Sequence, residues 1–563
     1  MDFKKEIANK IGQLVEMEHE KIMELIEIPP QSNMGDYAFP CFQFSKLLRK
    51  SPNMIAIDLA GKLIPDNIVG SVEAAGGYLN FFVNKAEFIK EVLTEVNAKG
   101  GDFGVSTEGN GKTVLVEFSS PNIAKPFHVG HLVNTLTGSA IEKIYRRLGY
   151  ETQRLNHIGD YGTNFGKQIA AYKHWGNEEA LEKDPITELL RVYVKFHEEE
   201  GNNPELEVEA RQLFKNLEDG EPEMVAIWKK FRDLSILEFK KLYKEFNIEF
   251  DSYNGESFYT DKMAEVVQML RDKDLLVESN GAQIVDLEKF GMPPCLIIKS
   301  DGATIYITRD LAAALYRHRT YNFYKCLYVV GNTQALHFNQ LFTVLKLLGF
   351  EWAENMTHIG TSLVKFADRK MATRSGDMIY AKAVLDEAAE KTLEIVEAKN
   401  SNLANKADVA KKVGMGAVAY TILKNNKDKD IIFSWEDILS FEGDSGPYVQ
   451  YTCVRGRSIL RKAGEFPSTA DYSKLTSDEE FSLVKLLDGF KAALKEAADR
   501  YEPFVITRHI TELAKAYNKF YNSHPIMNAE SDVKAARLHL TKAVCNVIET
   551  GLNIIGIEVP ENM

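Results

Sequence analysis

A strand–loop–helix–strand unit in residues 113–158 most constrains the fold of this chain. Residues 113–118 are a predominantly apolar run typical of a buried strand, and apolar residues recur with helical spacing through residues 132–148. Gly149 is a natural helix end, and residues 151–158 predict the next strand. Such a unit implies a parallel sheet with a ligand site at the carboxyl end of its first strand.

The loop after this first strand carries a compact set of polar residues. His128 and His131 lie three positions apart at a predicted helix start and therefore share one face, and Gly130 between them lets a planar base approach the backbone. The free amides and positive dipole of a helix N-terminus suit a phosphate, and Lys125 adds a mobile charge. The pattern predicts a nucleotide site, although not a P-loop, because G-x-x-x-x-G-K-[ST] is absent.

Three other short matches are interpreted differently. His157-Ile-Gly-Asp160 and His358-Ile-Gly-Thr361 resemble the histidine motif, but they lie at a predicted strand end and a turn, which favours structural roles. The dinucleotide-like pattern in residues 414–419 falls inside a helical repeat rather than after a strand, so we reject it.

A second basic cluster occupies residues 368–377. Lys370 and Arg374, together with Thr373 and Gly376, predict a cationic loop that could clamp a polyphosphate. Alone, such a cluster would be interpreted as a solvated turn. Its pairing with the histidine loop favours the polyphosphate clamp.

The charge of the chain is unevenly distributed. The formal net charge of −13 would by itself argue against a nucleic-acid partner, because phosphates attract Lys and Arg. However, residues 177–223 contain fifteen acidic and five basic residues, whereas residues 446–463 contain four basic residues and no acidic one. We interpret the acidic stretch as a solvated helical insertion. Its apolar residues expected to face inward are Leu189, Leu190, Val192, Val194 and Phe196.

The remaining patterns organise the chain into an α/β protein. We expect a Rossmann-like parallel-sheet catalytic domain, an N-terminal α+β module and a C-terminal all-helical bundle. A helix is expected over residues 3–28, and strands are expected at 78–83, 295–299, 303–308 and 325–330. The expected regions are residues 1–105, 106–380 with a helical insertion at about 165–260, a helical stem-contact region at 381–445, and 446–563.

Cysteine usage and hydropathy indicate in which cellular environment we expect the protein. The five cysteines form no C-x-x-C pair, so we expect no zinc site and no disulfide framework, and a reduced, cytoplasmic location. No apolar run reaches the ~18 residues of a membrane helix, so we expect no membrane partner.

The two basic motifs identify a family. The chain resembles class I aminoacyl-tRNA synthetases, with residues 128–131 standing for the HIGH signature and residues 370–374 for KMSKS. More narrowly it resembles arginyl-tRNA synthetases. The segments that carry this narrower resemblance are residues 119–131, 306–312, 331–338, 447–451 and 551–563.

The resemblance implies a two-step reaction. Arginine attacks ATP to give arginyl-adenylate and pyrophosphate, and arginine then passes to the 2′-hydroxyl of the terminal adenosine of tRNA(Arg). Mg²⁺ would arrive with ATP, without a dedicated protein cage. The implied catalytic residues are Lys125, His128, His131, Lys370 and Arg374, and the implied ATP-binding residues are His128, Gly130, His131, His337, Lys370 and Met371.

The KMSKS-like motif departs from the family pattern. Thr373 replaces its second lysine and Ala372 replaces its serine. The resemblance implies that Lys125 supplies the missing charge.

Recognition of arginine is also implied by the resemblance. A guanidinium requires planar carboxylate partners. Asp310 and Glu117, with Tyr306 and Glu256, would face this group, whereas Ser120, Asn122 and Gln334 would hold the α-amino and carboxylate groups. Structural alternatives remain open for three residues. Asp310 could cap a helix, Glu256 could be a loop carboxylate, and Tyr306 could be a core tyrosine.

The C-terminal region resembles the anticodon-binding domain of the family. Tyr448, Tyr451, Arg455 and Lys462 fall on nearly one helix face and are the implied tRNA-binding residues, with stacking by tyrosines and phosphate contacts by basic residues. The alternative is that the tyrosines belong to the core. The N-terminal module resembles the one that reads the D-loop side of the tRNA elbow, and a monomer is the family default.

Two other functions would explain only part of the sequence. An adenylating enzyme without a tRNA partner would not explain the helical C-terminal region with its basic start. A tRNA-binding paralogue without catalysis would not explain why the chain retains both histidines, Lys125, Lys370, Asp310 and Gln334.

Overall fold

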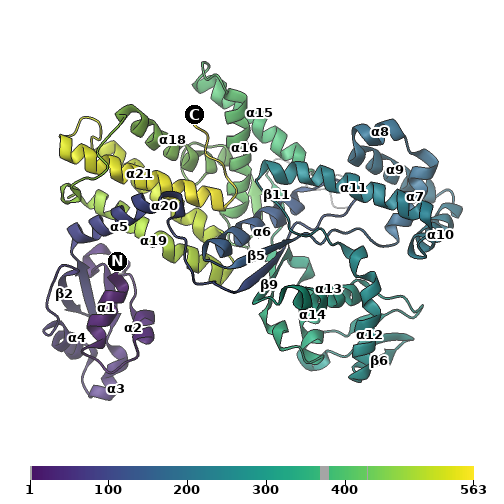
Figure 1. The fold of residues 1–563 in the computed structure, drawn as a ribbon, viewed down its shortest axis with the longest axis horizontal. Helices are drawn as coiled ribbons and strands as arrows, with labels where there is room; N and C mark the ends of the chain where they lie inside the picture. Colours follow the sequence, from purple (N-terminus) through teal and green to yellow (C-terminus); the bar gives the residue numbers. More distant parts are fainter. Residues whose placement is uncertain (1–2, 368–378, 428) are drawn as a thin grey trace. The chain divides into compact units, whose positions relative to one another are not determined.

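The computed structural model describes residues 3–367, 379–427 and 429–563 (Figure 1). Its contacts divide the chain into two compact units. The first unit comprises Met1–Phe103, Arg455–Phe490 and Glu512–Ile548, and the second comprises Gly104–Val454, Lys491–Thr511 and Glu549–Met563.

The first unit begins with a small α+β module. Its antiparallel sheet has the order β1-β3-β2, and Ile7, Ile22, Phe39 and Phe81 are fully buried in the core beneath it. The elements are α1 (Phe3–Gly12), α2 (His19–Leu25), β1 (Tyr37–Pro40), α3 (Ser45–Leu48), α4 (Pro52–Ala60), β2 (Val69–Ala75) and β3 (Tyr78–Val83).

The helix expected over residues 3–28 is two helices, so that prediction is wrong in its continuity. The first helix ends at Gly12, and α2 packs closely over this position. A β-carbon at Gly12 would lie 3.5 Å from Cδ1 of Ile22. Residues 13–18 connect the two helices, which pack against each other.

Helix α5 (Lys85–Lys99) joins this module to C-terminal helical segments within the same unit. The ring of Phe88 contacts Phe3 at 4.9 Å and Phe481 at 5.7 Å, and Nδ2 of Asn97 donates to the carbonyl of His539. The C-terminal helices, which the two units share, are α18 (Gly446–Ala463), α19 (Asp478–Arg500), α20 (Phe504–Ser523) and α21 (Ser531–Ile554).

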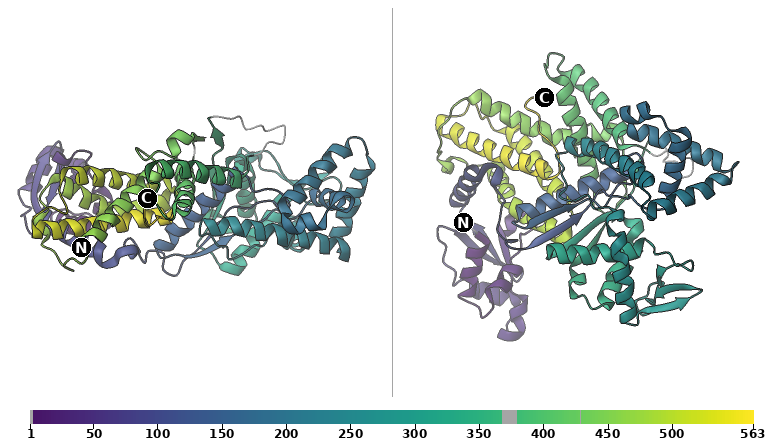
Figure 2. Two further views of the ribbon diagram at one scale, coloured as in Figure 1. Left: turned by 90° about the horizontal axis from the view of Figure 1, so that it is seen from above. Right: turned by 45° about the vertical axis from the view of Figure 1, so that its right-hand side comes forward.

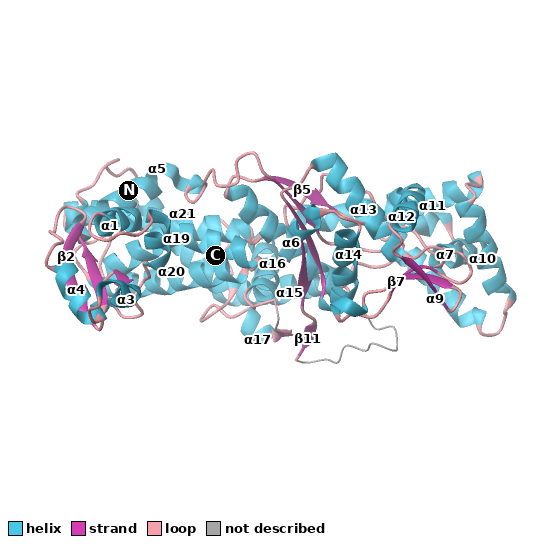
Figure 3. Cartoon of the chain, turned by 90° about the horizontal axis from the view of Figure 1, so that it is seen from below, coloured by secondary structure: helices cyan, strands magenta, loops and turns pink. Residues whose placement is uncertain are grey.

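The second unit is built on a four-stranded parallel sheet, whose strands are among those drawn in magenta in Figure 3. Its order is β10-β9-β4-β5, and the helical C-terminal region follows, so the predicted fold class is confirmed. The strands are β4 (Thr113–Glu117), β5 (Glu151–Leu155), β9 (Lys325–Gly331) and β10 (Met356–Thr361).

Helices cover both faces of this sheet (Figure 1). Helix α6 (Val129–Arg147) packs against β4, β5 and β9. Helices α13 (Tyr306–Tyr321) and α14 (Ala335–Leu347) share a core with Leu115 and Cys326. Because side chains alternate along a strand, the two helical layers bury opposite faces of β4.

The acidic stretch lies in a helical insertion, whose helices are bundled together in both views of Figure 2. Leu189, Val192 and Phe196 are fully buried, as expected, and Leu190 is half-buried. Val194 is 46% exposed, so the inward orientation predicted for it is wrong. The helices are α7 (Asn164–Trp175), α8 (Glu178–Lys183), α9 (Pro185–Glu200), α10 (Glu205–Glu218) and α11 (Pro222–Glu245).

The strand predicted over residues 303–308 is not present. Helix α13 begins at Tyr306 instead, and the hydroxyl of Thr308 donates to the carbonyl of Ile297 in β8. Buried Ile307 and Leu311 lie four residues apart, so the apolar pattern continues with helical spacing beyond the predicted strand. The neighbouring elements are α12 (Met263–Asp272), β6 (Leu276–Ser279), β7 (Ala282–Val285) and β8 (Cys295–Ile298).

The rest of the second unit is mainly helical. It contains α15 (Ala381–Lys399), α16 (Lys406–Leu423), α17 (Trp435–Ile438) and the short pair β11 (Val364–Phe366) and β12 (Ile431–Phe433). Among the described residues, no helix combines the length and the apolar character needed to cross a membrane.

Candidate active site

The candidate site lies where the order of the parallel sheet changes direction. The chain passes from β4 to β5 on one side and from β9 to β10 on the other, so β4 and β9 are the neighbouring inner strands. Ligands of open α/β sheets bind in the crevice beyond the carboxyl ends at such a point. Here those ends are Glu117 and Gly331.

The loop after β4 holds a strained conformation that its neighbours stabilise. Ser119, Ser120 and Ala124 all have positive φ angles, which non-glycine residues rarely adopt. The backbone N–H of Ala124 donates to Oγ of Ser235 in α11 at 2.9 Å. The hydroxyls of Ser119 and Tyr243, also in α11, lie 2.8 Å apart. The helical insertion thus braces the loop.

His128 and His131 form the start of helix α6. Nδ1 of His128 accepts the backbone N–H of His131, and Nδ1 of His131 accepts the backbone N–H of His128, both at 3.3 Å. The rings stack with centroids 3.5 Å apart. Since each Nδ1 is an acceptor, each neutral ring carries its proton on Nε2 and can donate it outward.

Burial keeps this pair neutral. Burial lowers the pKa of His128, and burial together with the neighbouring His128 lowers the pKa of His131 to about 3. A β-carbon on Gly130 would lie only 3.0 Å from Cε1 of His128. The glycine therefore makes room for the His128 ring, which occupies the space in which the sequence suggested that a base could approach.

Lys125 lies in the same loop and is half-buried. Its Nζ lies 5.3 Å over the ring of Tyr193 in α9, and burial lowers its pKa. Lys370, Met371 and Arg374 lie outside the described residues.

The chain that follows the second basic motif returns to the histidine loop. The backbone N–H of Val129 donates to the carbonyl of Ile379 at 3.0 Å. The N–H of Ala381 donates to the carbonyl of Phe127 at 2.9 Å. Residues 379–381 therefore pair with the backbone on either side of His128.

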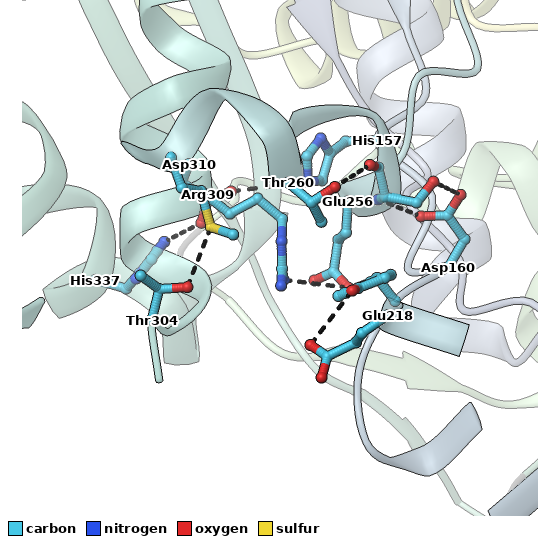
Figure 4. A network of polar contacts seen from close by, with 12 residues as sticks. His157, Asp160, Glu218, Glu256, Thr260, Thr304, Arg309, Asp310 and His337 are labelled. Atoms are coloured by element: carbon cyan, nitrogen blue, oxygen red, sulfur yellow. Dashed lines mark hydrogen bonds and ion pairs between the residues drawn. The ribbon is translucent and has the colours of Figure 1, made fainter. Parts of the chain in front are cut away.

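Asp310 faces two histidines, His157 and His337 (Figure 4). Its Oδ2 lies 2.8 Å from Nε2 of His337, and its Oδ1 lies 3.7 Å from Nε2 of His157. Burial alone would raise the pKa of the Asp310 carboxyl, but the hydrogen bond from His337 holds it below its ordinary value. The side chain is 27% exposed, so a ligand can reach an ionised carboxylate.

Two alternatives for residues of this helix are excluded. Asp310 is the fifth residue of α13, whose N-cap is Ile305, so Asp310 is not a helix cap. Tyr306 is 58% exposed, with its ring 5.1 Å from that of His337, so it is not a core tyrosine.

Glu256 starts a short 3-10 segment and is paired with a resident arginine. Its Oε2 lies 3.7 Å from Nη1 of Arg309 (Figure 4). The Arg309 guanidinium lies 5.2 Å over the ring of Tyr161. Burial raises the pKa of Glu256 to about 7 although Arg309 opposes the shift. This carboxyl is therefore poised to ionise fully when a further cation approaches.

Glu117 also has a resident partner. Its Oε2 lies 2.5 Å from Nη2 of Arg317, and both side chains are buried. In this structure the Glu117 carboxylate therefore already binds a guanidinium, that of Arg317. The role of Glu117 in recognition of the substrate arginine remains a prediction.

The other predicted arginine ligands lie at the loop ends. The buried hydroxyl of Ser120 has no hydrogen-bond partner among the described residues. Asn122 and Gln334 are exposed, after β4 and β9 respectively. A β-carbon on Gly159 would lie 2.0 Å from Oδ1 of Asn122, so this glycine makes room for the asparagine.

The sequence did not identify His157, Arg309 and Arg317 as site residues. His157 stands at the predicted strand end, as expected, but it faces Asp310. The signal available for the arginines was their spacing of four residues from the apolar Ala313, which puts all three on one helix face, where a buried charge requires a partner. His358, in contrast to His157, makes a structural contact: its Nε2 donates to the carbonyl of Val330.

The predicted tRNA ligands lie on α18 and are divided between the units. In the second unit, Tyr448 and Tyr451 are half-buried, and the Tyr451 ring lies 6.2 Å from that of Phe441.

In the first unit, Arg455 donates from Nη1 to Oδ1 of Asn518 at 2.9 Å and lies 5.2 Å over the ring of Tyr521. Lys462 is exposed.

Among the described residues, no group of three or more His, Cys, Asp or Glu side chains could hold a metal ion.

Three family models together match most of the chain. The model described as tRNA synthetases class I (R), catalytic domain, matches residues 92–435. The DALR anticodon binding domain matches residues 449–563, and the Arginyl tRNA synthetase N terminal domain matches residues 1–83.

Individual relatives agree with this assignment. The chain is 56% identical to arginine--tRNA ligase of Clostridium botulinum (strain Langeland) and 55% identical to that of Clostridium perfringens, over the full length of both. Among solved structures it matches Thermus thermophilus arginyl-tRNA synthetase with a TM-score of 0.82 and 26% identity, covering 100% of this chain and 99% of the other. The Plasmodium falciparum enzyme, at 22% identity and a TM-score of 0.80, supports the fold, covering 100% of this chain and 99% of that one. The chain therefore belongs to the arginyl-tRNA synthetases, the class I enzymes that attach arginine to tRNA in protein synthesis.

Proposed function

We propose that the crevice between β4 and β9 carries out both steps of this reaction with the residues described above. Arginine attacks the α-phosphate of ATP to form arginyl-adenylate and pyrophosphate, and the arginyl group then passes to the 2′-hydroxyl of the terminal adenosine of tRNA(Arg). Neither step needs a protein nucleophile. The site must therefore work by positioning reactants and stabilising developing charge.

The reciprocal cap of His128 and His131 is the observation that best supports the ATP site. Both Nδ1 atoms are engaged by backbone N–H groups, which leaves both Nε2–H groups as donors. Neutral donors of fixed orientation beside a helix N-terminus suit phosphate oxygens that gain charge during the reaction. Gly130 keeps this geometry possible, and His337 would lie near the adenine or ribose.

Lys125 would hold the departing pyrophosphate with Lys370 and Arg374 of the second motif, and Met371 would contribute to ATP binding. The pairing of residues 379–381 with the backbone around His128 supports this assignment, because it brings the chain after Arg374 to the phosphate loop. Mg²⁺ would come with ATP as part of the substrate and keep most of its water.

Asp310 would bind the guanidinium of arginine, with Tyr306 beside it. The support is an ionised, partly exposed carboxylate held by His337. Glu256 and Glu117 would add negative potential, although each faces a resident guanidinium. Ser120, Asn122 and Gln334 would bind the α-amino and carboxylate groups of the substrate.

Recognition of tRNA would use the two ends of the chain. Tyr448, Tyr451, Arg455 and Lys462 would contact the anticodon region, and the module of residues 1–83 would contact the elbow. We further propose that the protein acts as a cytoplasmic monomer.

ATP–pyrophosphate exchange with each amino acid, with and without tRNA(Arg), tests these assignments. We expect exchange with arginine, and its loss in Asp310→Asn and in His131→Ala. Unchanged arginine KM in Asp310→Asn would overturn the assignment of the arginine site. Unchanged exchange in Lys125→Ala would overturn the role of Lys125.

A further inference from the structure

A buried ion pair lies behind the proposed arginine site. Arg317 is 2% exposed and Glu117 is 5% exposed, with 2.5 Å between Nη2 and Oε2. The guanidinium also lies 5.4 Å over the ring of Tyr328 and 6.0 Å over that of Tyr259. Further hydrogen bonds from the guanidinium help to offset the cost of burying such a pair.

One of those groups reaches His157. Nη2 of Arg317 lies 3.3 Å from Nδ1 of His157. A guanidinium has donors and no acceptor, so Nδ1 must accept this hydrogen bond. The imidazole is therefore neutral and carries its proton on Nε2. Stacking on Tyr259, with centroids 5.5 Å apart and planes at 22°, fixes the plane of the ring.

The proton on Nε2 points toward Asp310. Nε2 of His157 lies 3.7 Å from Oδ1, slightly beyond hydrogen-bond length, whereas His337 binds Oδ2 at 2.8 Å. His157 follows β5, whereas His337 lies in the first turn of α14, and the two histidines face different oxygens of one carboxylate. Contacts in ligand-free sites are often long and shorten when the substrate binds.

We propose that His157 is a positioning residue for arginine recognition: anchored by the Glu117–Arg317 pair, it orients the carboxylate of Asp310. Rotation about the last bond of an aspartate side chain is soft, so one hydrogen bond does not fix its plane. A guanidinium binds a carboxylate best through two parallel hydrogen bonds, which require that plane to be set. This inference rests on the proposed contact between Asp310 and arginine.

Variants of His157 separate orientation from packing. His157→Phe keeps the ring on Tyr259 and removes both nitrogens, whereas His157→Gln keeps a donor able to reach Asp310. In exchange assays with tRNA present, we expect His157→Phe to raise arginine KM about tenfold and ATP KM less than about twofold. His157→Gln should restore arginine KM to within about threefold of the parent value.

The matched control lies on the same helix as Arg317. His318 stacks on Trp352 at 4.6 Å, away from Asp310, so His318→Phe should leave arginine KM unchanged. Melting temperatures of all variants identify any loss of folding. If His157→Phe does not fold, His157→Asn replaces it, because its shorter donor cannot reach Asp310 and the same rise is expected.

A double-mutant cycle distinguishes this inference from the proposed function. The readout is the increase in melting temperature produced by arginine, which needs no catalysis. If Asp310→Asn binds arginine normally, the proposed contact itself fails. If Asp310→Asn loses arginine but His157→Phe does not, only the role of His157 fails. The role of His157 is supported if His157→Phe causes no further loss of arginine affinity in the Asp310→Asn background. It is overturned if the losses of arginine affinity caused by the two changes multiply.

Discussion

His128 and His131 cap each other: each Nδ1 accepts the backbone N–H of the other residue at 3.3 Å. The same atoms that begin helix α6 therefore determine which nitrogen of each ring carries the proton. Local folding and the chemistry of the site are linked here, since a change in the cap would also change the donors offered to a phosphate.

His128→Asn tests this link. Asparagine is a good N-cap acceptor, so the variant should keep the stability that His128→Ala loses, about 1 kcal/mol. Asparagine cannot place a donor where Nε2–H of His128 lies, so ATP–pyrophosphate exchange should fall about 10²-fold in both variants. Urea denaturation and exchange rates measure the two effects. Normal exchange in the asparagine variant would show that only the cap matters.

The neutral state of His131 predicts acid sensitivity of the fold. Burial and the neighbouring His128 lower the pKa of His131 from its ordinary value of 6.5 to about 3. As the pH falls below 6.5, the unfolded chain takes up a proton that the folded chain refuses, so stability falls until about pH 3. The slope contributed by this residue is at most about 1.4 kcal/mol per pH unit.

Urea denaturation at several pH values between 4 and 7 checks this prediction. His131→Asn removes the titrating group, so its stability should depend less on pH over that range than that of the parent protein. If the free energy of unfolding depends on pH equally in the two proteins, folded His131 takes up a proton as readily as unfolded His131, which would contradict the prediction.

The sequence predicted the loop after β4 and the central strands because those elements depend on local patterns. It could not predict the start of α13, because the residue types at 303–308 fit a strand as well as a helix. Only the spacing of Ile307 and Leu311 favours the helix. Nor could it show that His157 lies between Arg317 and Asp310, because those two contacts join residues that are more than 150 positions apart. Glu117 illustrates the same limit, since its pairing with Arg317 follows from tertiary packing.

Gly159→Ala should impair arginine binding through Asn122. The added β-carbon would lie 2.0 Å from Oδ1 of Asn122, so that side chain must move. If Asn122 holds the substrate, arginine KM in the exchange assay should rise several-fold while ATP KM stays nearly constant. Gly201→Ala is the control, because no atom lies within 4 Å of its added β-carbon. Equal kinetics in both variants would remove Asn122 from the site.

Glu117→Gln should destabilise the catalytic unit. Arg317 would then be a buried charge without a counter-ion, at a cost of about 3–5 kcal/mol. Glu265→Gln is the control, because it breaks a pair with Arg319 on the same helix whose side chains are about half exposed. That change should cost about 1 kcal/mol or less. Urea denaturation measures the free energy of unfolding of both variants. Equal losses of stability would show that the buried Glu117–Arg317 pair is no more important for stability than the exposed pair.

The distribution of charge predicts which surface meets tRNA. Ten of the net negative charges lie in residues 177–223. Lys167 of the neighbouring helix α7 binds both Glu200 and Glu207, so part of that charge is neutralised locally. We expect this insertion to lie away from the bound tRNA. Replacing exposed Glu198 and Glu199 with glutamine should therefore leave tRNA affinity and its salt dependence unchanged.

Lys462→Ala is the complementary change. This exposed lysine belongs to the stretch of residues 446–463 that contains no acidic residue. A lost phosphate contact should weaken tRNA binding and reduce the slope of log affinity against log salt by about 0.7. Titrations of tRNA at several salt concentrations measure both quantities. A larger effect from the glutamine substitutions than from Lys462→Ala would place the acidic insertion, rather than helix α18, at the tRNA surface.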